Sequence, residues 1–336
     1  MEAQNEITEE AGLNLQKFKE GFMLSQCGFL AMRLNLPELL AGQEKTVAQM
    51  AQETDTQARP LACLLGILSS YGFVQSLGGE RYGATPALPL LGEMCHSLGD
   101  RFSYQSWGES FHTLKTDKPS WDKVFGKPYY ASLHENREAA DNFDSLCKLT
   151  AEQGLDLFLS RVDYSTVNYL VDLGGNTGTI LTGILKTYPH LKGTVFDIPA
   201  VVAKAETEFR EAGVEQRATA VGGSFFDNIP KGGDMYSFFR VLLNWSDKDA
   251  LQILKNTAAA MAVDGTLVVV DYVMPDPDHA QFRTLSFGSM NLMVNMGGYV
   301  RSDEQWRELL HEASFKVSKV TAIPDYSINI IEARRR

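Results

Sequence analysis

A glycine-rich segment, Val171 to Thr179, has residue types that suit the binding of a nucleotide-like ligand: it reads VDLGGNTGT. Glycine lets the backbone turn tightly and approach a ligand, and a helix that begins there offers backbone N–H groups. The dinucleotide fingerprint reads G-x-G-x-x-G, but Asn176 stands where it needs a glycine. The segment instead reads acidic-x-G-x-x-x-G, with Asp172, Gly174 and Gly178. This pattern disfavours NAD.

Asp197 ends a second β-rich run, nineteen residues beyond Gly178. Its carboxylate is suited to accept hydrogen bonds from both hydroxyl groups of a ribose. The glycine loop alone is a weak signal, since many structural turns contain paired glycines. The loop and the carboxylate together, among alternating strands and helices, predict a nucleoside cofactor bound by Gly174, Gly175 and Asp197.

The elements that position these residues belong to the second half of the chain, where β-rich runs alternate with helical patterns. The β-rich runs are TVNYLVDL, GTVFD, ATAVGG, DMYSFF and TLVVVDYV. Such alternation is typical of an α/β fold with a parallel, Rossmann-like sheet covered on both faces. After a helix predicted over 303–312, the runs FKVSKVTAI and YSINIIEA are expected to pair as an antiparallel hairpin.

The first hundred residues predict a mostly helical domain. Residues 13–42 have apolar positions at helical spacing, and this stripe suits core packing, a dimer seam or a ligand wall. Short helices and the segment GERYGATP follow, which is the pattern of a winged helix. Residues 45–75 contain two basic and two acidic side chains, so they lack the positive stripe of a DNA-binding surface.

Composition narrows the class further. The chain has 336 residues, about the length of two domains, and its formal net charge of −11 opposes nucleic acid as a partner. No apolar run approaches the roughly 20 residues that span a bilayer, and the acidic start does not resemble a secretory signal. The four cysteines form no C-x-x-C pair. We expect a reduced, cytoplasmic protein with no membrane partner and no metal.

Several segments resemble the two-domain small-molecule O-methyltransferases of the caffeate type. They are VDLGGNTG, VFDIPAVV, VGGSFFDNIPKGGDMY, VLLNWSD, LVVVDYVMPD, WGESFHTLKTDKPSWDKVFG and MGGYVRSDEQW. The resemblance implies S-adenosylmethionine bound between Gly174 and Asp197, a small phenolic acceptor and a homodimer. It also implies a winged-helix-like dimerisation domain over 1–100, a helical segment lining the substrate pocket over 101–165, and a seven-stranded methyltransferase domain over 166–336.

The resemblance also places side chains around the cofactor. It implies that Ser224 and Phe225 edge the adenine and that the backbone near Phe239 and Arg240 surrounds the methionine end. Trp245 is expected to pack beside the cofactor. The family usually has an acidic residue where Ser224 stands, so this chain departs from the pattern that binds the adenine amino group.

The departure with the largest chemical consequence is at the catalytic base. The family usually reads L-H-D-W, and its histidine removes the phenol proton. This chain reads Leu242-Leu243-Asn244-Trp245, and leucine cannot accept a proton. The glutamate that often supports the histidine is replaced by Val300. These paired losses predict methyl transfer by alignment of the reacting atoms, without the usual base.

Three side chains remain candidates for catalysis. His112 is a candidate base or a hydrogen-bonded wall residue, Asp271 could orient a hydroxyl or cap a loop, and Asn244 could hydrogen-bond the acceptor. The side chains expected to contact the acceptor are Trp107, Met290, Met293 and Arg301. The thioethers suit a flat ligand, and core packing is an equal alternative for them.

The sequences L-L-N-W and G-G-x-x-R-[ST] are similar to the anthracycline-tailoring branch, which includes carminomycin O-methyltransferase and the non-methylating aclacinomycin hydroxylase. The branch implies a planar polyketide acceptor. We expect O-methylation of a phenolic hydroxyl on a fused or quinoid aromatic. The alternatives are an enzyme that retains the cofactor without methylating, such as a hydroxylase, decarboxylase or pericyclase, and, from another class, a winged-helix regulator.

Overall fold

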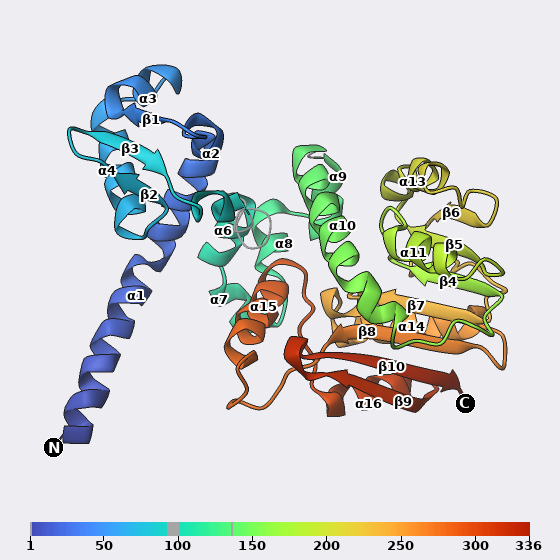
Figure 1. The fold of residues 1–336 in the computed structure, drawn as a ribbon. Helices are drawn as coiled ribbons and strands as arrows, with labels where there is room; N and C mark the ends of the chain where they lie inside the picture. Colours follow the sequence, from blue (N-terminus) through green and yellow to red (C-terminus); the bar gives the residue numbers. More distant parts are fainter. Residues whose placement is uncertain (1, 93–100, 136) are drawn as a thin grey trace. The chain divides into compact units, whose positions relative to one another are not determined.

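The chain divides into two units, Met1–Tyr104 and Gln105–Arg336, and each has its own hydrophobic core (Figure 1). The structure, a computed structural model, describes residues 2–92, 101–135 and 137–336. Among those residues, no helix is both long and apolar enough to cross a membrane.

The N-terminal unit contains the predicted helices and hairpin. Its elements are α1 (Glu2–Arg33), α2 (Leu36–Leu39), β1 (Glu44–Thr46), α3 (Val47–Glu53), α4 (Ala58–Ser70), β2 (Val74–Ser76), β3 (Arg81–Ala84) and the 3-10 turn η1 (Leu88–Leu90). The three strands form an antiparallel sheet in the order β1-β3-β2. Lys45 pairs with Glu53 and Arg81 with Glu44, so these basic side chains are neutralised rather than gathered into a positive stripe.

The helical pattern of residues 13–42 comprises two helices, with the break just before Leu36-Pro37. Helix α1 starts well before residue 13 and ends at Arg33, and α2 begins at Leu36. The break lies at Asn35, whose φ of 50° is left-handed and cannot continue a right-handed helix. Proline near the start of α2 fits because the first helical turn needs no donated N–H there.

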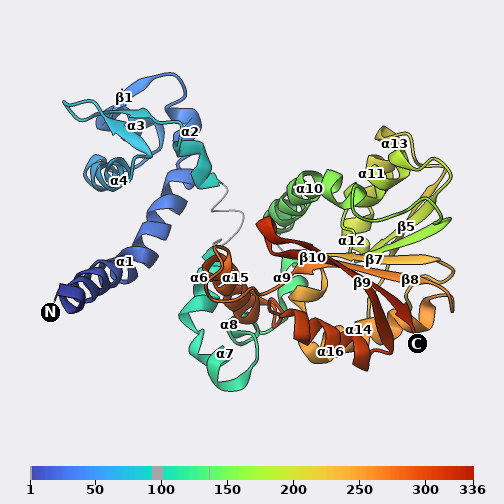
Figure 2. The same cartoon turned by 60° about the horizontal axis from the view of Figure 1, so that its bottom comes forward.

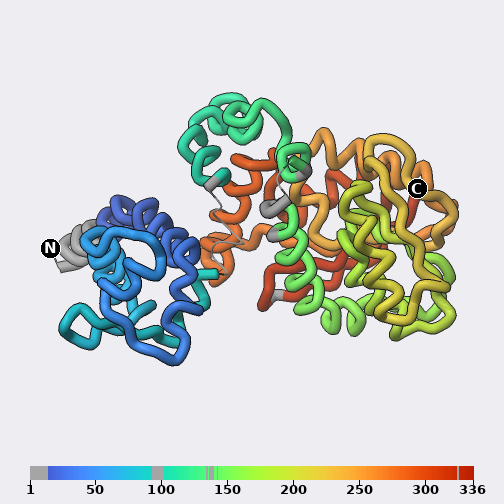
Figure 3. Tube along the Cα trace, turned by 90° about the horizontal axis from the view of Figure 1, so that it is seen from above, coloured from blue at the N-terminus to red at the C-terminus, as the bar shows by residue number. Residues whose placement is uncertain are grey.

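Short helices follow in the segment that was expected to be helical. They are α6 (Arg101–Gly108), α7 (Phe111–Thr116), α8 (Ser120–Phe125), α9 (Tyr129–Glu135) and the long α10 (Arg137–Leu159). Helix α15 (Phe282–Asn295), far away in sequence, lies beside this group, as the orange and teal segments of Figure 3 show. The Trp107 indole N–H donates to Asn291 Oδ1 at 2.8 Å and joins α6 to α15.

A seven-stranded sheet forms the centre of the second unit, with the strand order β6-β5-β4-β7-β8-β10-β9. The strands are β4 (Tyr169–Leu173), β5 (Lys192–Asp197), β6 (Ala218–Gly222), β7 (Met235–Phe239), β8 (Thr266–Tyr272), β9 (Phe315–Ile323) and β10 (Ile328–Arg335). The first five are parallel, and β9 and β10 pair as the predicted antiparallel hairpin. The hairpin inserts β10 next to β8, which leaves β9 at the edge. The α/β prediction is confirmed.

Helices cover both faces of this sheet (Figure 2). The covering helices are α10 and α11 (Thr179–Thr187) with α12 (Pro199–Val202) and α13 (Ala205–Glu211) on one face, and α14 (Asp247–Ala260) and α16 (Asp303–Glu312) on the other. Each face therefore packs into a separate apolar core. Because both faces are buried, the central strands are nearly continuous hydrophobic runs, as in VVV of β8.

Candidate active site

The loops that follow the parallel strands meet at one edge of the sheet. The carboxyl ends of parallel strands point the same way, so the residues after them converge whatever their distance in sequence. The predicted residues placed there are Gly174 and Gly175 after β4, Asp197 at the end of β5, Ser224 and Phe225 after β6, Phe239 and Arg240 at the end of β7, and Asp271 near the end of β8. The η2 turn (Leu242–Asn244) follows β7.

The glycines after β4 are required by the backbone. Gly174 has φ of 73°, and its N–H donates to the Phe196 carbonyl at 2.7 Å. A Cβ on Gly175 would lie 2.3 Å from Asp172 Oδ2 and 2.7 Å from Val195 Cγ2. No real side chain tolerates such contacts, so the loop must run directly above the buried Asp172.

Asp197 is held in a fixed orientation by backbone donors. Its Oδ1 accepts the Ile198 N–H at 2.7 Å, and its Oδ2 accepts the Asn176 N–H at 2.9 Å. Each carboxylate oxygen can accept more than one hydrogen bond, so this arrangement is compatible with further donors such as ribose hydroxyls. The glycine loop, the carboxylate and the start of α11, whose first residues follow Gly178 without a side-chain cap, together fit a nucleoside cofactor.

An aromatic cluster borders the same edge. The Phe225 ring lies 5.9 Å from Phe196, 6.1 Å from Phe238 and 6.2 Å from Trp245, measured between ring centroids. The Ser224 hydroxyl accepts the Phe226 N–H at 3.2 Å, so it stabilises the turn that presents Phe225. This cluster is an apolar edge on which a flat base such as adenine can pack.

Arg240 has an unusual conformation and surroundings. Its φ is 56°, its N–H donates to the Val270 carbonyl at 2.8 Å, and its buried Nε has no hydrogen-bond partner among the described residues. Its positive charge interacts with Asp271 and with the buried Cys147 thiol of α10. The ring of the neighbouring Phe239 packs on Phe158 of α10, with a centroid distance of 5.1 Å. Arg240 therefore brings a positive charge near Asp271 and Cys147.

The position of the missing base is apolar and firmly held. Leu243 is 7% exposed, and its N–H donates to Asp271 Oδ2 at 3.1 Å. Asp271 is 1% exposed and its Oδ1 accepts the Tyr272 N–H at 2.9 Å. Burial raises the pKa of Asp271 to about 7. The carboxyl group thus anchors the η2 turn, which supports the loop-capping interpretation of Asp271 over a direct contact with the acceptor.

Arg301 holds the same turn from the other side. Its side chain is fully buried, and it donates to the Leu242 carbonyl at 3.0 Å, the Trp245 carbonyl at 2.8 Å and Asp247 Oδ1 at 2.9 Å. A Cβ on Gly298 would lie 2.1 Å from the Leu243 carbonyl oxygen, so the two segments are in backbone contact. These contacts give Arg301 a structural role, and its contact with the acceptor stays a prediction.

Tyr130 joins the site from α9, in a segment rich in aromatic residues that was a candidate wall of the pocket. Its ring stacks on Trp245 with a centroid distance of 5.8 Å and an interplanar angle of 24°. Burial raises the pKa of Tyr130 well above its usual value; the nearby Tyr129, Cys147 and Asp197 add to the shift, and a hydrogen bond with the Asn244 side chain opposes it. Tyr130 thus places a hydroxyl beside Asn244. The aromatic run around it was the only signal in the sequence.

His112 lies away from the predicted base position. Its Nε2 is 3.3 Å from the Thr116 hydroxyl of the same helix, and its charge interacts with Glu109 and Asp122. These neighbours belong to the α7–α8 region rather than to the η2 turn. These interactions fit the wall-residue interpretation of His112, and its role as a base stays a prediction.

Met290 and Met293 lie on α15 and are half-buried. The same helix carries the amide side chains of Asn291 and Asn295. Asn295 Nδ2 donates to Asn291 Oδ1 at 2.9 Å. The buried Asn295 Oδ1 has no hydrogen-bond partner among the described residues. Trp107 contacts Asn291, so it belongs to this helix-bound group. Thioethers, an indole and amides together can contact a flat ligand with polar substituents.

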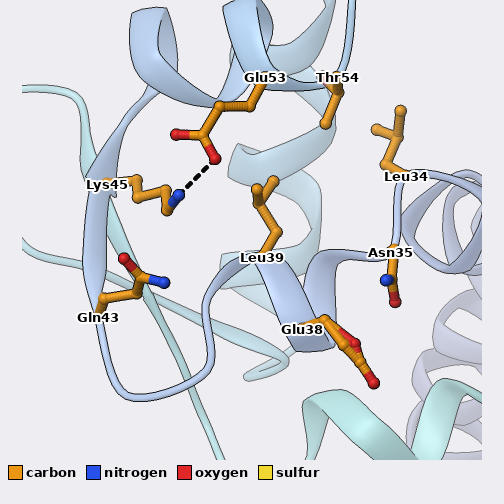
Figure 4. Close-up of a pocket in the computed structure, with 8 residues that line it drawn as sticks. All are labelled: Leu34, Asn35, Glu38, Leu39, Gln43, Lys45, Glu53 and Thr54. Atoms are coloured by element: carbon orange, nitrogen blue, oxygen red, sulfur yellow. Dashed lines mark hydrogen bonds and ion pairs between the residues drawn. The ribbon is translucent and has the colours of Figure 1, made fainter.

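A shallow pocket in the N-terminal unit has a different character (Figure 4). Its volume is about 410 Å³. Its lining residues are Leu34, Asn35, Glu38, Leu39, Gln43, Lys45, Glu53 and Thr54. Lys45 and Glu53 neutralise each other across it, and the lining contains no aromatic side chain. It contains none of the residues predicted to bind cofactor or acceptor.

Comparison with known proteins identifies the family of this chain. Residues 104–316 match the O-methyltransferase domain, and residues 17–91 match the O-methyltransferase dimerisation domain. The chain is 31% identical to the O-demethylpuromycin-O-methyltransferase of Streptomyces alboniger over 325 residues, 93% of this chain and 86% of that protein. It is 30% identical to the aclacinomycin 10-hydroxylase RdmB of Streptomyces purpurascens, over 86% of this chain and 82% of that protein.

Among solved structures, the O-methyltransferase NcsB1 from neocarzinostatin biosynthesis, in complex with S-adenosylmethionine and 2-hydroxy-5-methyl naphthoic acid, has a TM-score of 0.84 and 25% identity. The match covers 93% of this chain and 96% of NcsB1. The family model alone covers more than half of the chain. The chain therefore belongs to the O-methyltransferase family with an N-terminal dimerisation domain, and its cofactor is S-adenosylmethionine.

Proposed function

We propose that this enzyme methylates a phenolic hydroxyl on a fused or quinoid aromatic natural product. The aromatic and thioether side chains around the site suit a flat acceptor. NcsB1 was solved in complex with a naphthoic acid, and two relatives are named for O-demethylpuromycin and aclacinomycin. The observation that carries the proposal is Leu243, an apolar side chain held at the position of the base.

The proposed cofactor site uses the residues at the carboxyl edge of the sheet. Asp197 binds the ribose hydroxyls, and Gly174 and Gly175 let the backbone approach the nucleoside. Ser224 and Phe225 edge the adenine, with Trp245 packed beside the cofactor. Phe239 and Arg240 surround the methionine end. When bound, the cofactor supplies an electrophilic methyl group on its sulfonium.

The proposed mechanism relies on position and on the acidity of the acceptor. Methyl transfer breaks the carbon–sulfur bond and forms a carbon–oxygen bond, and the phenol proton passes to solvent. Alignment alone can contribute ~10⁵-fold or more in well-oriented reactions. Asn244 and Tyr130 place an amide and a hydroxyl where they can orient the acceptor oxygen. A quinone carbonyl beside the phenol lowers its pKa and reduces the need for a base.

The proposed division of labour follows the expected boundaries of 1–100, 101–165 and 166–336. The N-terminal domain makes a homodimer, because α1 exposes large apolar side chains; Phe18 is 82% exposed and Phe22 56%. The segment 101–165 lines the acceptor pocket, because it carries Tyr130. Cys27, Cys63 and Cys147 are free thiols, which supports a reduced, cytoplasmic location.

A second candidate function is a reaction that retains the methyl group on the cofactor. One specific observation favours it: the relative RdmB is named a 10-hydroxylase, and it matches most of this chain. Methyl-labelled cofactor and a panel of hydroxyanthraquinones distinguish the two. A product heavier by one labelled methyl group supports O-methylation. An altered product without label, with the label still on the cofactor, supports the second function.

A further inference from the structure

Asn176 connects the cofactor loop to a helix outside it. The residue has a left-handed φ of 53°, and its side chain makes two hydrogen bonds. Oδ1 accepts the Thr177 N–H at 2.8 Å, and Nδ2 donates to Asp144 Oδ1 of helix α10 at 3.0 Å. Its backbone N–H donates to Asp197 Oδ2 at 2.9 Å. Asn176 therefore links Asp144 of α10 to the carboxylate of Asp197, through its side-chain amide and its backbone N–H.

Asp144 is itself held from its other side. It is 9% exposed, and its Oδ2 accepts the Lys204 ammonium at 2.7 Å. Lys204 lies between α12 and α13, just beyond the strand that ends in Asp197, and it also donates to Asp141 at 2.8 Å. A buried carboxylate needs such compensation, because burial without a partner strongly disfavours its charged form. Asp144 thus bridges a fixed cation and the Asn176 amide.

We propose that Asp144 is a positioning residue for the cofactor: with Lys204 it holds Asn176 in the left-handed conformation, and the Asn176 N–H in turn orients Asp197. A residue other than glycine adopts that conformation at a cost, which local hydrogen bonds offset. Without the bond to Asp144, the Asn176 peptide relaxes and the carboxylate of Asp197 loses the Asn176 N–H, one of its backbone donors. The inference rests on the proposed function insofar as Asp197 binds the ribose.

The chain offers a matched control on the same two elements. Lys148 of α10 donates to Glu208 Oε2 of α13 at 2.8 Å, so it also ties α10 to the segment after β5. That ion pair does not involve the Asn176 side chain. Lys148→Met removes a tie between the same elements while leaving the Asp144–Asn176 bond in place. Lys148→Met therefore measures how much the loss of an ion pair between these elements affects cofactor binding by itself.

The test is calorimetric binding of S-adenosylhomocysteine to full-length variants. Asp144→Ala is expected to weaken binding about tenfold, the effect of one lost hydrogen bond to a charged group, and Lys148→Met less than about twofold. With saturating acceptor, Asp144→Ala should raise the KM for S-adenosylmethionine and leave kcat within about twofold. Equal losses for Asp144→Ala and Lys148→Met would overturn the proposal.

A double-mutant cycle tests the route through Asn176. Glycine adopts the left-handed conformation without side-chain support, so Asp144→Ala should cost less than about threefold in the Asn176→Gly background. An unchanged tenfold loss in that background would show that Asp144 acts on the cofactor by another route, and would overturn the proposal. Lys204→Met, which leaves Asp144 in place, should weaken binding in the same direction and serves if Asp144→Ala does not fold.

The proposed function fails separately from this inference. If the wild-type protein does not bind S-adenosylhomocysteine, or if Asp197→Ala binds it as tightly, the assignment of Asp197 to the ribose is wrong. If the wild type binds, Asp197→Ala does not, and Asp144→Ala matches Lys148→Met, only the positioning role of Asp144 is wrong.

Discussion

Replacing Asp172 by asparagine should change how the stability of the protein depends on pH. Asp172 is fully buried under Gly175; its Oδ1 accepts the Ser237 hydroxyl at 2.9 Å, and its Oδ2 has no partner among the described residues. Burial raises its pKa to about 7; the Ser237 hydrogen bond opposes this shift and the charge of Asp197 adds to it. In the unfolded chain an aspartate has a pKa of about 3.9.

The sign of the effect follows from proton binding. Between pH 4 and pH 7 the folded protein keeps a proton on Asp172 that the unfolded chain has released, so this group makes the free energy of unfolding fall as pH rises. The difference between the two pKa values corresponds to a loss of about 4 kcal/mol in the free energy of unfolding. This loss is complete above pH 7 and absent below pH 4. Asparagine cannot ionise, so Asp172→Asn removes this contribution.

Urea unfolding of both proteins between pH 4 and pH 8 measures it. As pH rises from 4 to 8, the free energy of unfolding of Asp172→Asn should increase by about 4 kcal/mol relative to that of wild type. Ser237→Ala is the control: without its hydroxyl the ionised carboxylate is less favoured, so the pH dependence should become larger and extend to higher pH. A stability difference between wild type and Asp172→Asn that is constant across the range would refute the assignment.

Four further outcomes are expected. His112→Ala should change kcat less than about tenfold, because the interactions that the described residues give His112 are with Thr116, Glu109 and Asp122; a loss beyond ~10³-fold at unchanged acceptor affinity would make it the base. Leu243→His should raise turnover on weakly acidic phenols, by up to ~10²-fold, and leave acidic hydroxyquinones unchanged; equal effects would contradict the proposed mechanism. Gly175→Ala should abolish cofactor binding in calorimetry, since its methyl group would collide with Asp172 Oδ2, and unchanged binding would place the ligand elsewhere. Phe22→Lys should give a monomer by light scattering where the wild type gives a dimer, and a dimeric variant would exclude the α1 surface as the interface.

Features set by local pattern could be predicted from the sequence. The alternation of β-rich and helical runs predicted the α/β sheet, because the spacing of apolar residues reports directly on which faces are buried. The final helix, Asp303–Glu312, was predicted with its observed bounds, since Ser302 and Gln305 form a capping box. The glycines at 174 and 178 indicated the cofactor loop, because glycine is the residue that most readily adopts the left-handed conformation which this loop requires.

Tertiary structure decided the roles of the polar side chains. Arg301 and Asp271 looked alike in the sequence as charged residues near the acceptor, yet both are buried and hold the η2 backbone. Tyr130 and Asp144 showed no distinctive signal, because an aromatic or acidic residue on an amphipathic helix is common whatever it faces. Asn244, the partner of Tyr130, lies more than a hundred residues away in the chain. Asn176, the partner of Asp144, lies more than thirty residues away. Periodicity specifies which face of an element is buried, but only the packing of distant elements determines which polar groups meet there.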